Sequence, residues 1–526
     1  MGNKAATNNR KIEDQIIKNP AEELRHNVEI LNKEIQELYL LDEIPWVIGY
    51  SGGKDSTCIL QLVWNAIAAL PEEKRIKTIS VITTDTLVEN PIVSAWVRNS
   101  IQHIKKAAQQ QKMPIEAHLL HPEYTETFWA GLIGKGYPPP RGKFRWCTER
   151  LKIKPSNNFI RNVVRQHGET ILVLGIRKAE SSKRAHRMKE WEKDRLRDRL
   201  SPNAYLPNSL VYSPVEDWTT NEVWMYLMQW NNPWGHSNKD LFTMYRGATA
   251  DSECPLVVDT TTPTCGNSRF GCWVCTLVSQ DKSLNAMVQN DTEKEWLQPL
   301  LDIRADLDTD NNRDRRDFRR RNGKVQLYER NLDGQVSVEP IPGPFTKEAR
   351  EDWLRKILTA EIELRQNAPE GFKNISLITP EELSEIRRIW LEERHEFDDS
   401  LPRIYKEVTG EVFKDIRVGA DEKLLGNDEW DILEEICGDD GMHLELMAKL
   451  LDTERQYHTK YRRVGIYESL EECFNTSSRS KEEAIKNAHQ KRDLKAASSE
   501  GDIEKVKQLT WGSIKFGNNE HNEAKS

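Results

Sequence analysis

The sequence lacks any long hydrophobic run. No stretch of about 18 apolar residues occurs among its 526 residues, so no helix is expected to span a membrane. The first residues also lack the apolar core of a secretory signal, and Ala6 stands where a myristoylation signal requires serine or threonine. These absences predict a cytoplasmic protein that does not contact a membrane.

Cysteine is scarce as well, at 8 residues. In a reducing compartment such thiols are expected to be free, metal-bound or reactive rather than paired in disulfides. The net charge of −8 gives no general attraction for nucleic acid, so any such contact requires local basic patches. The length predicts two or three domains, and a charged fraction of 30% with a mean hydropathy of −0.72 indicates much exposed helix.

Apolar strands and amphipathic helices alternate as far as about residue 245. This alternation predicts an α/β fold with a parallel five-stranded sheet and helices on both faces. Ligands of such sheets bind at the carboxyl ends of the strands. The expected strands span residues 46–50, 78–83, 115–120, 171–174 and 210–212, and the expected helices span 13–41, 56–70 and 220–230, with another opened by Pro91.

The segment VIGYSGGKDST, residues 47–57, follows the first expected strand and opens a helix. Its two glycines let backbone amides approach an oxyanion, Lys54 adds positive charge, and the helix N-terminus adds unpaired N–H groups. The spacing is not that of a Walker A loop, because Ile48 stands at the place of its first glycine and Asp55 replaces its Ser/Thr. The segment therefore predicts a phosphate-binding loop of another kind. A tight turn without a ligand is the less favoured alternative.

This loop resembles the SGGxDS loop of the ATP-pyrophosphatase (PP-loop) superfamily. Its members include sulfonucleotide (PAPS) reductases, tRNA thiolases and amide-forming synthetases, and most cleave ATP between the α and β phosphates. The resemblance implies an adenine nucleotide alpha hydrolase-like domain that binds ATP and Mg²⁺ and stabilises the charge of departing pyrophosphate. The residues that it assigns to pyrophosphate are Ser51, Gly52, Gly53, Lys54, Asp55 and Ser56, with Lys54 and Asp55 as catalytic residues.

Two further segments resemble parts of PAPS reductases. TTDTLVENP resembles their Asp-Thr segment, which implies that Asp85 and Thr86 lie near the nucleotide. A helix cap is an equally good interpretation of either residue alone. GIRKAESSKRA resembles their Gly-x-Arg with a downstream arginine, so Gly175, Arg184 and a catalytic Arg177 are expected to face phosphates or an anionic substrate. Its basic residues could instead form a solvated face.

Four cysteines have the spacing of metal ligands. Cys272 and Cys275 form a C-x-x-C pair, Cys265 lies seven residues upstream, and Cys147 stands alone in RWCTERLK. Thiolates suit zinc or an iron–sulfur cluster, and the residues alone leave both open. GCWVCT and the isolated cysteine resemble segments of PAPS-reductase relatives, which implies a [4Fe-4S] cluster on these four residues. Cys254 could replace Cys265 as a ligand or carry sulfur as a persulfide.

The combination of these motifs resembles the DndC family of DNA phosphorothioation sulfurtransferases over about the first 290 residues. It implies a DNA-modifying enzyme that replaces a non-bridging oxygen of a backbone phosphate with sulfur. A cysteine desulfurase would supply the sulfur, and DNA and DndD- and DndE-like proteins would be the partners. The alternatives are a sulfonucleotide (PAPS/APS) reductase and a tRNA thiolase. Such reductases resemble one another in a C-terminal Cys-Gly segment, whereas this sequence has no cysteine after Cys473.

The second half of the chain carries fewer motifs. Six arginines lie between residues 313 and 321, and they fit a solvated face or a DNA phosphate contact equally well. Helices are expected at 347–366, 380–397 and 430–461, and the polar composition from Ser477 predicts a frayed end. The domain organisation expected is a helical segment at 1–44, the PP-loop and PAPS reductase-like domain with the cluster segment at 45–290, and a charged, mostly helical region at 291–526 with a hairpin at 324–339.

Overall fold

The computed structural model of the chain describes residues 20–510 apart from 143, 181–184, 187, 190–198, 204, 249–270, 310–311, 333–334, 418–424, 459 and 478–479. Contacts divide the chain into two compact units. Unit 1 comprises Met1–Glu123, Pro140–Arg304 and Leu364–Ile375, and unit 2 comprises Tyr124–Pro139, Ala305–Glu363 and Ser376–Ser526. The division expected from the sequence at residues 44 and 290 stays a prediction.

Unit 1 is built on one sheet with the strand order β3-β2-β1-β4-β6-β5. The first five strands in this order are parallel, which confirms the expected parallel sheet, and β5 pairs with β6 in the antiparallel sense. The two residues of β5 were too short a run to predict a strand. The strands are β1 (Trp46–Gly49), β2 (Ile79–Thr84), β3 (Ile115–Leu120), β4 (Thr170–Val173), β5 (Ser201–Pro202) and β6 (Ser209–Tyr212).

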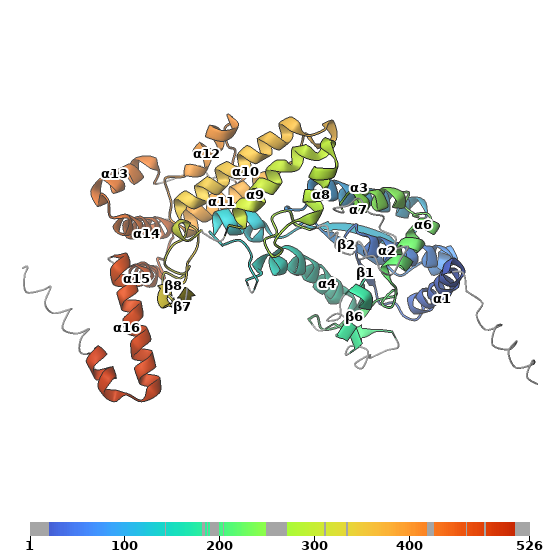
Figure 1. Cartoon of the computed structure of the whole chain (residues 1–526), viewed down its shortest axis with the longest axis horizontal. Coiled ribbons are helices and arrows are strands. Elements are labelled where there is room, and N and C mark those ends of the chain that lie inside the picture. Colours follow the sequence, from blue (N-terminus) through green and yellow to red (C-terminus); the bar gives the residue numbers. More distant parts are fainter. Residues whose placement is uncertain are drawn as a thin grey trace, which may run out of the picture. The chain divides into compact units, whose positions relative to one another are not determined.

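Helices cover both faces of this sheet, as expected (Figure 1). Ile48 of β1 belongs to the core formed with α1, α2, α3 and α6, whereas its neighbour Val47 belongs to the core formed with Ile160 of α4. Because side chains alternate along a strand, one short apolar run supplies both cores. The helices of this part are α1 (Pro20–Leu40), α2 (Lys54–Ala68), α3 (Pro91–Gln110), α4 (Lys154–His167), α6 (Thr220–Gln229), α7 (Asn238–Gly247), α8 (Lys282–Asn290) and α9 (Gln298–Leu307).

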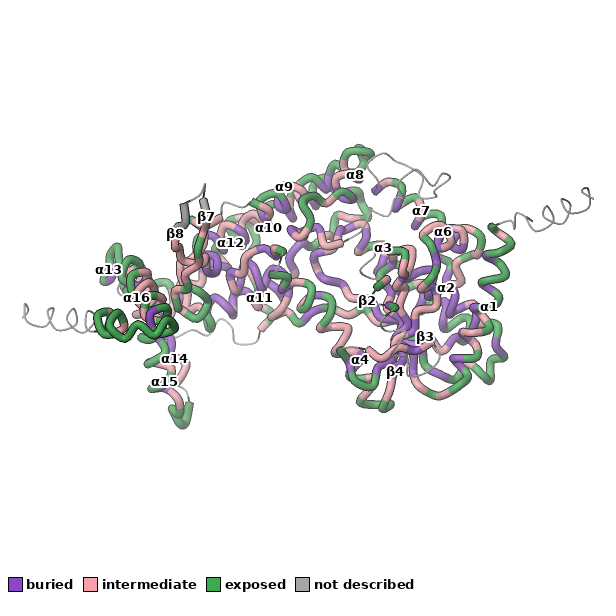
Figure 2. The backbone as a smooth tube through the Cα atoms, turned by 60° about the horizontal axis from the view of Figure 1, so that its bottom comes forward, coloured by how far each residue is buried: buried purple, intermediate pink, exposed green. Residues whose placement is uncertain are grey.

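The apolar spacing of the first helix matches its burial. Leu24, Val28, Leu31 and Ile35 are all buried, and α1 has a purple and a green side in Figure 2. The helix was expected to begin at Glu13, which lies outside the described residues. No helix in the described ranges is long and apolar enough to cross a membrane.

The second half of the chain is mainly helical, as expected, with one hairpin. The hairpin expected at 324–339 is present as β7 (Leu327–Leu332) and β8 (Gln335–Pro340). The helices are α10 (Lys347–Asn367), α11 (Pro380–Arg388), α12 (Ser400–Thr409), α13 (Asn427–Cys437), α14 (Gly441–His458), α15 (Ile466–Thr476) and α16 (Lys481–Glu500), and a π-helical turn at Ile389–Glu393 extends α11.

Two expectations for this half are wrong. The helix expected over 430–461 is two helices, because α13 ends before Gly438, whose φ of +57° a helix cannot continue. The frayed segment expected from Ser477 contains α16, which Ser480 caps by accepting a hydrogen bond from the Glu483 N–H. Only Ala484 and Ala497 of this helix are buried, so its sequence carries little apolar signal.

A buried carboxyl group should make the stability of unit 2 depend on pH. Glu382 is fully buried at the start of α11, where its Oε2 accepts the Thr379 N–H at 3.0 Å and its Oε1 has no partner. Burial raises its pKa to about 7, above the ordinary value of 4.5. The folded protein holds this proton more tightly than the unfolded protein does. The protonated carboxyl therefore contributes fully to the free energy of unfolding below pH 4.5, and this contribution is lost as pH rises through about 7.

The expected result is that wild-type unit 2 loses about 3 kcal/mol of unfolding free energy between pH 4.5 and pH 8, relative to the Glu382→Gln variant. Denaturant titrations at several pH values would measure it. Parallel pH profiles of the two proteins would contradict the assignment.

Candidate nucleotide-binding site

The predicted phosphate loop lies at the carboxyl end of β1, a central strand of the sheet. Gly52 has a φ of +72°, and Gly53 is extended (φ −84°, ψ 168°) as the residue before α2. The helix therefore begins at Lys54, two residues earlier than expected. This start places the loop against the first turn of α2, where backbone N–H groups have no partner within the helix.

Hydrogen bonds close the loop on itself. The Ser51 N–H donates to Ser56 Oγ at 3.1 Å, and the Ser56 hydroxyl donates to the Gly53 carbonyl at 3.0 Å. The backbone N–H groups of Gly52 and Gly53 donate to no acceptor in the described part of the chain. The geometry thus leaves two amides for an anion, while the two serines hold the turn.

Three charged side chains converge at the loop. Lys54 Nζ lies 3.0 Å from Asp55 Oδ2, and Arg177 Nε donates to Asp55 Oδ1 at 2.8 Å. Arg177 also donates to the Trp218 carbonyl at 3.1 Å and to Thr220 Oγ1 at 3.3 Å, and its side chain is only 2% exposed. In the structure Arg177 thus binds a carboxylate, and its predicted contact with phosphate stays a prediction.

Gly175 is needed for close packing against the loop. A Cβ atom at this position would lie 3.0 Å from the carbonyl oxygen and 3.1 Å from the carbonyl carbon of Asp55. The backbone after β4 therefore approaches the first turn of α2 more closely than a side chain allows. This packing is sufficient to explain the glycine, whose predicted contact with phosphate stays a prediction.

The left-handed turn at Gly52 gives a prediction about stability. A Cβ atom at Gly52 would lie 2.6 Å from Val97 Cγ2, in addition to the strain of its positive φ. We expect Gly52→Ala to destabilise unit 1 by about 2–4 kcal/mol. Gly168→Ala is the matched control, with φ +84° and no described atom within 4 Å of the added carbon, and should cost about 1 kcal/mol. Chemical denaturation would compare them, and equal losses would show that Val97 gives way.

The Asp-Thr segment lies at the end of β2, next to β1 in the sheet. Asp85 accepts the Leu87 N–H at 2.9 Å and binds Arg98 at 2.8 Å, so its carboxylate supports the local turn and an ion pair. Thr86 is fully buried, and its Oγ1 lies 3.4 Å from the sulfur of Cys272. The segment thus joins the edge of the sheet that carries the predicted phosphate loop to the C-x-x-C pair.

Three of the predicted metal ligands share one neighbourhood in unit 1. Cys272 pairs with Glu89 in an antiparallel bridge, and the Cys275 N–H donates to the Cys272 carbonyl at 3.1 Å. Burial raises the pKa of Cys147 and raises that of Cys272 to about 11, and Lys152 opposes the latter shift. The charges of all three cysteines, Cys272 above all, raise the pKa of Lys152.

The remaining predicted residues lie outside the described part of the chain. These are Cys254, Cys265 and Arg184. Among the described residues, no group of three or more His, Cys, Asp or Glu is arranged to hold a metal ion. The four-cysteine ligand set therefore stays a prediction.

Several residues at the site were not identified from the sequence. Tyr245 of α7 accepts the Lys54 N–H at 3.3 Å, and its ring centroid lies 5.4 Å from Lys54 Nζ. A tyrosine 191 positions from its partner carries no local signal. Glu89 and Lys152, 3.8 Å apart beside the cysteines, belong to the motifs TTDTLVENP and RWCTERLK, so those motifs could have indicated them.

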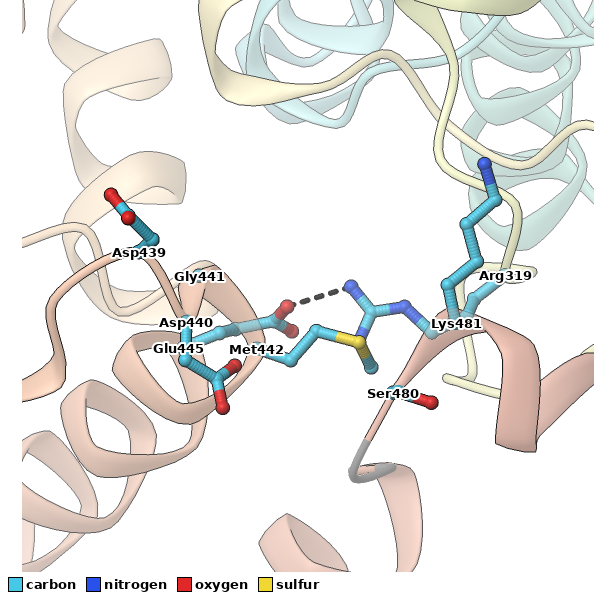
Figure 3. A pocket seen from close by; sticks show the side chains of 8 residues that line it. All are labelled: Arg319, Asp439, Asp440, Gly441, Met442, Glu445, Ser480 and Lys481. Atoms are coloured by element: carbon cyan, nitrogen blue, oxygen red, sulfur yellow. Dashed lines mark hydrogen bonds and ion pairs between the residues drawn. The ribbon is translucent and has the colours of Figure 1, made fainter.

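The arginine-rich segment of unit 2 is largely engaged within that unit. Arg319 binds Asp317 at 2.8 Å and Glu445 at 2.6 Å beside a cavity of about 690 Å³ (Figure 3). Arg313 binds Glu339, Arg315 binds Asp352, and Arg316 donates to the Gly343 carbonyl. These contacts favour a structural role for the segment over an open phosphate-binding face.

A glycine-rich loop at the end of β1 and a nearby cysteine pair are the two main features of this α/β domain. Residues 45–277 match the family model of the phosphoadenosine phosphosulfate reductase domain. This segment, which is less than half of the chain, is therefore similar to a PAPS reductase domain. The match contains the phosphate loop, the Asp-Thr segment and Cys147, Cys272 and Cys275.

Individual relatives are distant. The uncharacterized protein MJ0066 of Methanocaldococcus jannaschii is 26% identical over 200 residues, which are 38% of this chain and 35% of that protein. The chain thus spans about a third of the length of this curated relative.

Two solved structures are also similar. The PAPS reductase of Candida auris, a phosphate complex, is 13% identical with a TM-score of 0.24, over 40% of this chain and 85% of its own. The U34-tRNA thiolase NcsA of Methanococcus maripaludis, with its [4Fe-4S] cluster, is 12% identical with a TM-score of 0.27, over 54% and 80%. TM-scores this low do not establish a shared fold by themselves.

Proposed function

We propose that this chain is an ATP-dependent sulfurtransferase of DNA phosphorothioation, with the chemistry of the DndC family. It activates a backbone phosphate by adenylation and incorporates sulfur in place of a non-bridging oxygen. One observation carries the proposal most directly. Thr86, at the end of β2, contacts Cys272 at 3.4 Å, while the neighbouring strand β1 ends in the phosphate loop. The contact brings the C-x-x-C pair close to the proposed nucleotide site, which supports the proposal.

The reaction has two steps. A non-bridging oxygen of the DNA phosphate attacks the α phosphorus of ATP, a new P–O bond forms, and the bond to the β phosphate breaks to release pyrophosphate. A cysteine desulfurase supplies sulfur as a persulfide, and a dithiol reductant converts it to a sulfide-level nucleophile while forming a disulfide. The sulfide then attacks the DNA phosphorus. The P–S bond forms as the P–O bond to AMP breaks. Adenylation is needed because an oxide is a poor leaving group and AMP is a good one.

The described residues contribute mainly to the first step. The free amides of Gly52 and Gly53 and the charge of Lys54 can receive the negative charge that develops on pyrophosphate. Asp55 is the one carboxylate of the loop, and its two oxygens already bind Lys54 and Arg177. Mg²⁺ would therefore be bound chiefly through the phosphates of ATP, with Asp55 as the nearby acidic group.

The product distribution tests this scheme. Full-length protein, DNA, a sulfur donor with its reductant and ATP labelled in the α or γ phosphate should give AMP and pyrophosphate in equal amounts. Release of ADP and orthophosphate alone would rule the scheme out.

The [4Fe-4S] cluster belongs to the same proposal. Three half-buried thiols near one lysine fit an anionic sulfur-rich site in chemistry, although the described atoms do not complete one. When bound, such a cluster could hold or activate sulfur. Anaerobic purification should yield about four irons per chain, and stoichiometric zinc without iron would overturn the assignment. The cysteine desulfurase, DNA and DndD- and DndE-like partners are likewise proposed.

The match to the PAPS reductase domain favours a sulfonucleotide reductase as the second candidate. This activity predicts thioredoxin-dependent release of sulfite from PAPS or APS, which sulfite analysis would detect. A tRNA thiolase would share the loop chemistry, and an assay with tRNA in place of DNA would separate it.

A further inference from the structure

A stack of aromatic side chains on α3 lies next to the predicted phosphate loop. Trp96, Ser100 and His103 are spaced four and three residues apart, so they share one face of α3. His236, from the segment between α6 and α7, lies against this face. Its ring centroid is 3.8 Å from that of Trp96, with 26° between the planes, and 5.3 Å from that of His103. The imidazole thus fixes the plane in which the indole lies.

His236 is itself held in place. Its Nδ1 and the hydroxyl of Ser100 are 2.7 Å apart, and both side chains are buried. Burial, with a contribution from His103, lowers the pKa of His236 to about 4, while Asp240 opposes this shift. The ring is therefore neutral at neutral pH, and Trp96 packs on an uncharged surface.

Trp96 in turn contacts the phosphate loop directly. Its Nε1–H donates to the carbonyl oxygen of Gly52 at 3.1 Å. Because a peptide group is planar and trans, the N–H of Gly53 in the same group points away from Trp96. This N–H is one of the two loop amides without a partner among the described residues. The hydrogen bond from Trp96 to the Gly52 carbonyl therefore fixes the direction in which the Gly53 N–H points.

We propose that Trp96 is a positioning residue, held by His236, which aims the Gly53 N–H at the pyrophosphate group of the nucleotide. The inference rests on the proposed function, since it requires pyrophosphate to bind at this loop. His236 and Ser100 act through Trp96, and Ser100 also forms a hydrogen bond with Tyr50 next to the loop. Trp96→Phe keeps an aromatic ring for the stack and removes the indole N–H together with part of the ring. Trp64→Phe loses the same atoms elsewhere in unit 1, so the comparison isolates the bond to Gly52.

The test is calorimetric binding of magnesium pyrophosphate to the full chain. Trp96→Phe should weaken the affinity about five- to tenfold, the loss expected from one misdirected hydrogen bond, with little change in the unfolding midpoint. Trp64→Phe is the matched control. Trp64 is also buried in unit 1, and its Nε1–H donates to Gln111 Oε1 at 2.8 Å, away from the loop. This control should bind pyrophosphate as the wild type does.

A double-mutant cycle tests the role of His236. His236→Ala should weaken pyrophosphate binding in the wild type and add little in Trp96→Phe, because the two residues act in series. His236→Phe, which retains a ring against Trp96, serves if the alanine variant does not fold, and should bind better than Trp96→Phe.

The possible outcomes separate the role of His236, the role of Trp96 and the proposed function. Additive losses would overturn the role of His236. Unchanged affinity in Trp96→Phe, with a wild type that binds pyrophosphate, would overturn the whole inference and leave the proposed function intact. A wild type that binds no pyrophosphate would remove the proposed function, and the inference with it.

Discussion

In the proposed reaction, Lys54→Ala should slow the release of pyrophosphate from ATP by about 100- to 1000-fold. Lys54 lies at the N-terminus of α2 beside the loop amides, where its Nζ is 3.0 Å from Asp55 and its side chain is 14% exposed. A lysine here can turn from the carboxylate toward a phosphate. Its charge is of most use when pyrophosphate departs, because the leaving group then carries more negative charge than in ATP. The loss should therefore appear in kcat more than in KM.

Two measurements would establish the effect of Lys54→Ala. Pyrophosphate release gives the rate in the purified protein, and mass spectrometry of DNA from cells that carry the variant should show no phosphorothioate dinucleotides. Lys74→Ala removes an exposed lysine of the same unit and should leave both results unchanged. A Lys54→Ala protein that releases pyrophosphate at the wild-type rate would contradict the assignment of the loop.

Asp55→Ala should lower the unfolding free energy of unit 1 by about 3–5 kcal/mol. The substitution leaves the guanidinium of Arg177 buried, at 2% exposure, with only the neutral acceptors Trp218 O and Thr220 Oγ1. A buried cation without a counter-charge has lost its hydration, and two neutral acceptors compensate for this loss only in part. Asp55→Asn keeps an acceptor oxygen but removes the charge, so its loss should be intermediate.

The control for Asp55 is an exposed ion pair in the same unit. Asp217 binds Lys178 at 2.8 Å with its own side chain 73% exposed, and Asp217→Ala should cost about 1 kcal/mol or less. Denaturant titrations followed by tryptophan fluorescence would compare the variants. A loss below 1 kcal/mol for Asp55→Ala would mean that Arg177 reaches water when its partner is removed.

The sheet was predictable from the sequence because its strands are short apolar runs with helices between them. Residues 115–120 were predicted without error, and α2 began only two residues earlier than expected. Signals of this kind are local, since periodicity and turn residues act within one element. The prediction of a single helix over 430–461 was wrong, because Gly438 ends the first of two helices there.

The site was only partly predictable, for a related reason. The loop from Ser51 to Ser56 is one contiguous motif, whereas its supports come from distant segments. Tyr245 meets Lys54, Arg177 meets Asp55, and Trp96 meets Gly52 only after the sheet has formed. The sequence motif indicates that Arg177 is important. It does not indicate that the side chain is buried against a carboxylate, because burial depends on residues from other segments.

The three hydrogen bonds of the Arg177 guanidinium limit which residues can replace this arginine. One side chain joins Asp55 at the start of α2, Trp218 just before α6 and Thr220 within α6. A guanidinium offers donors fixed in a plane, which the single ammonium of lysine cannot match. A single substitution of Arg177 by lysine would weaken the contacts among all three segments, so few other residues can stand at position 177. In a directed-evolution library, we expect substitutions there to survive only alongside compensating changes at position 55.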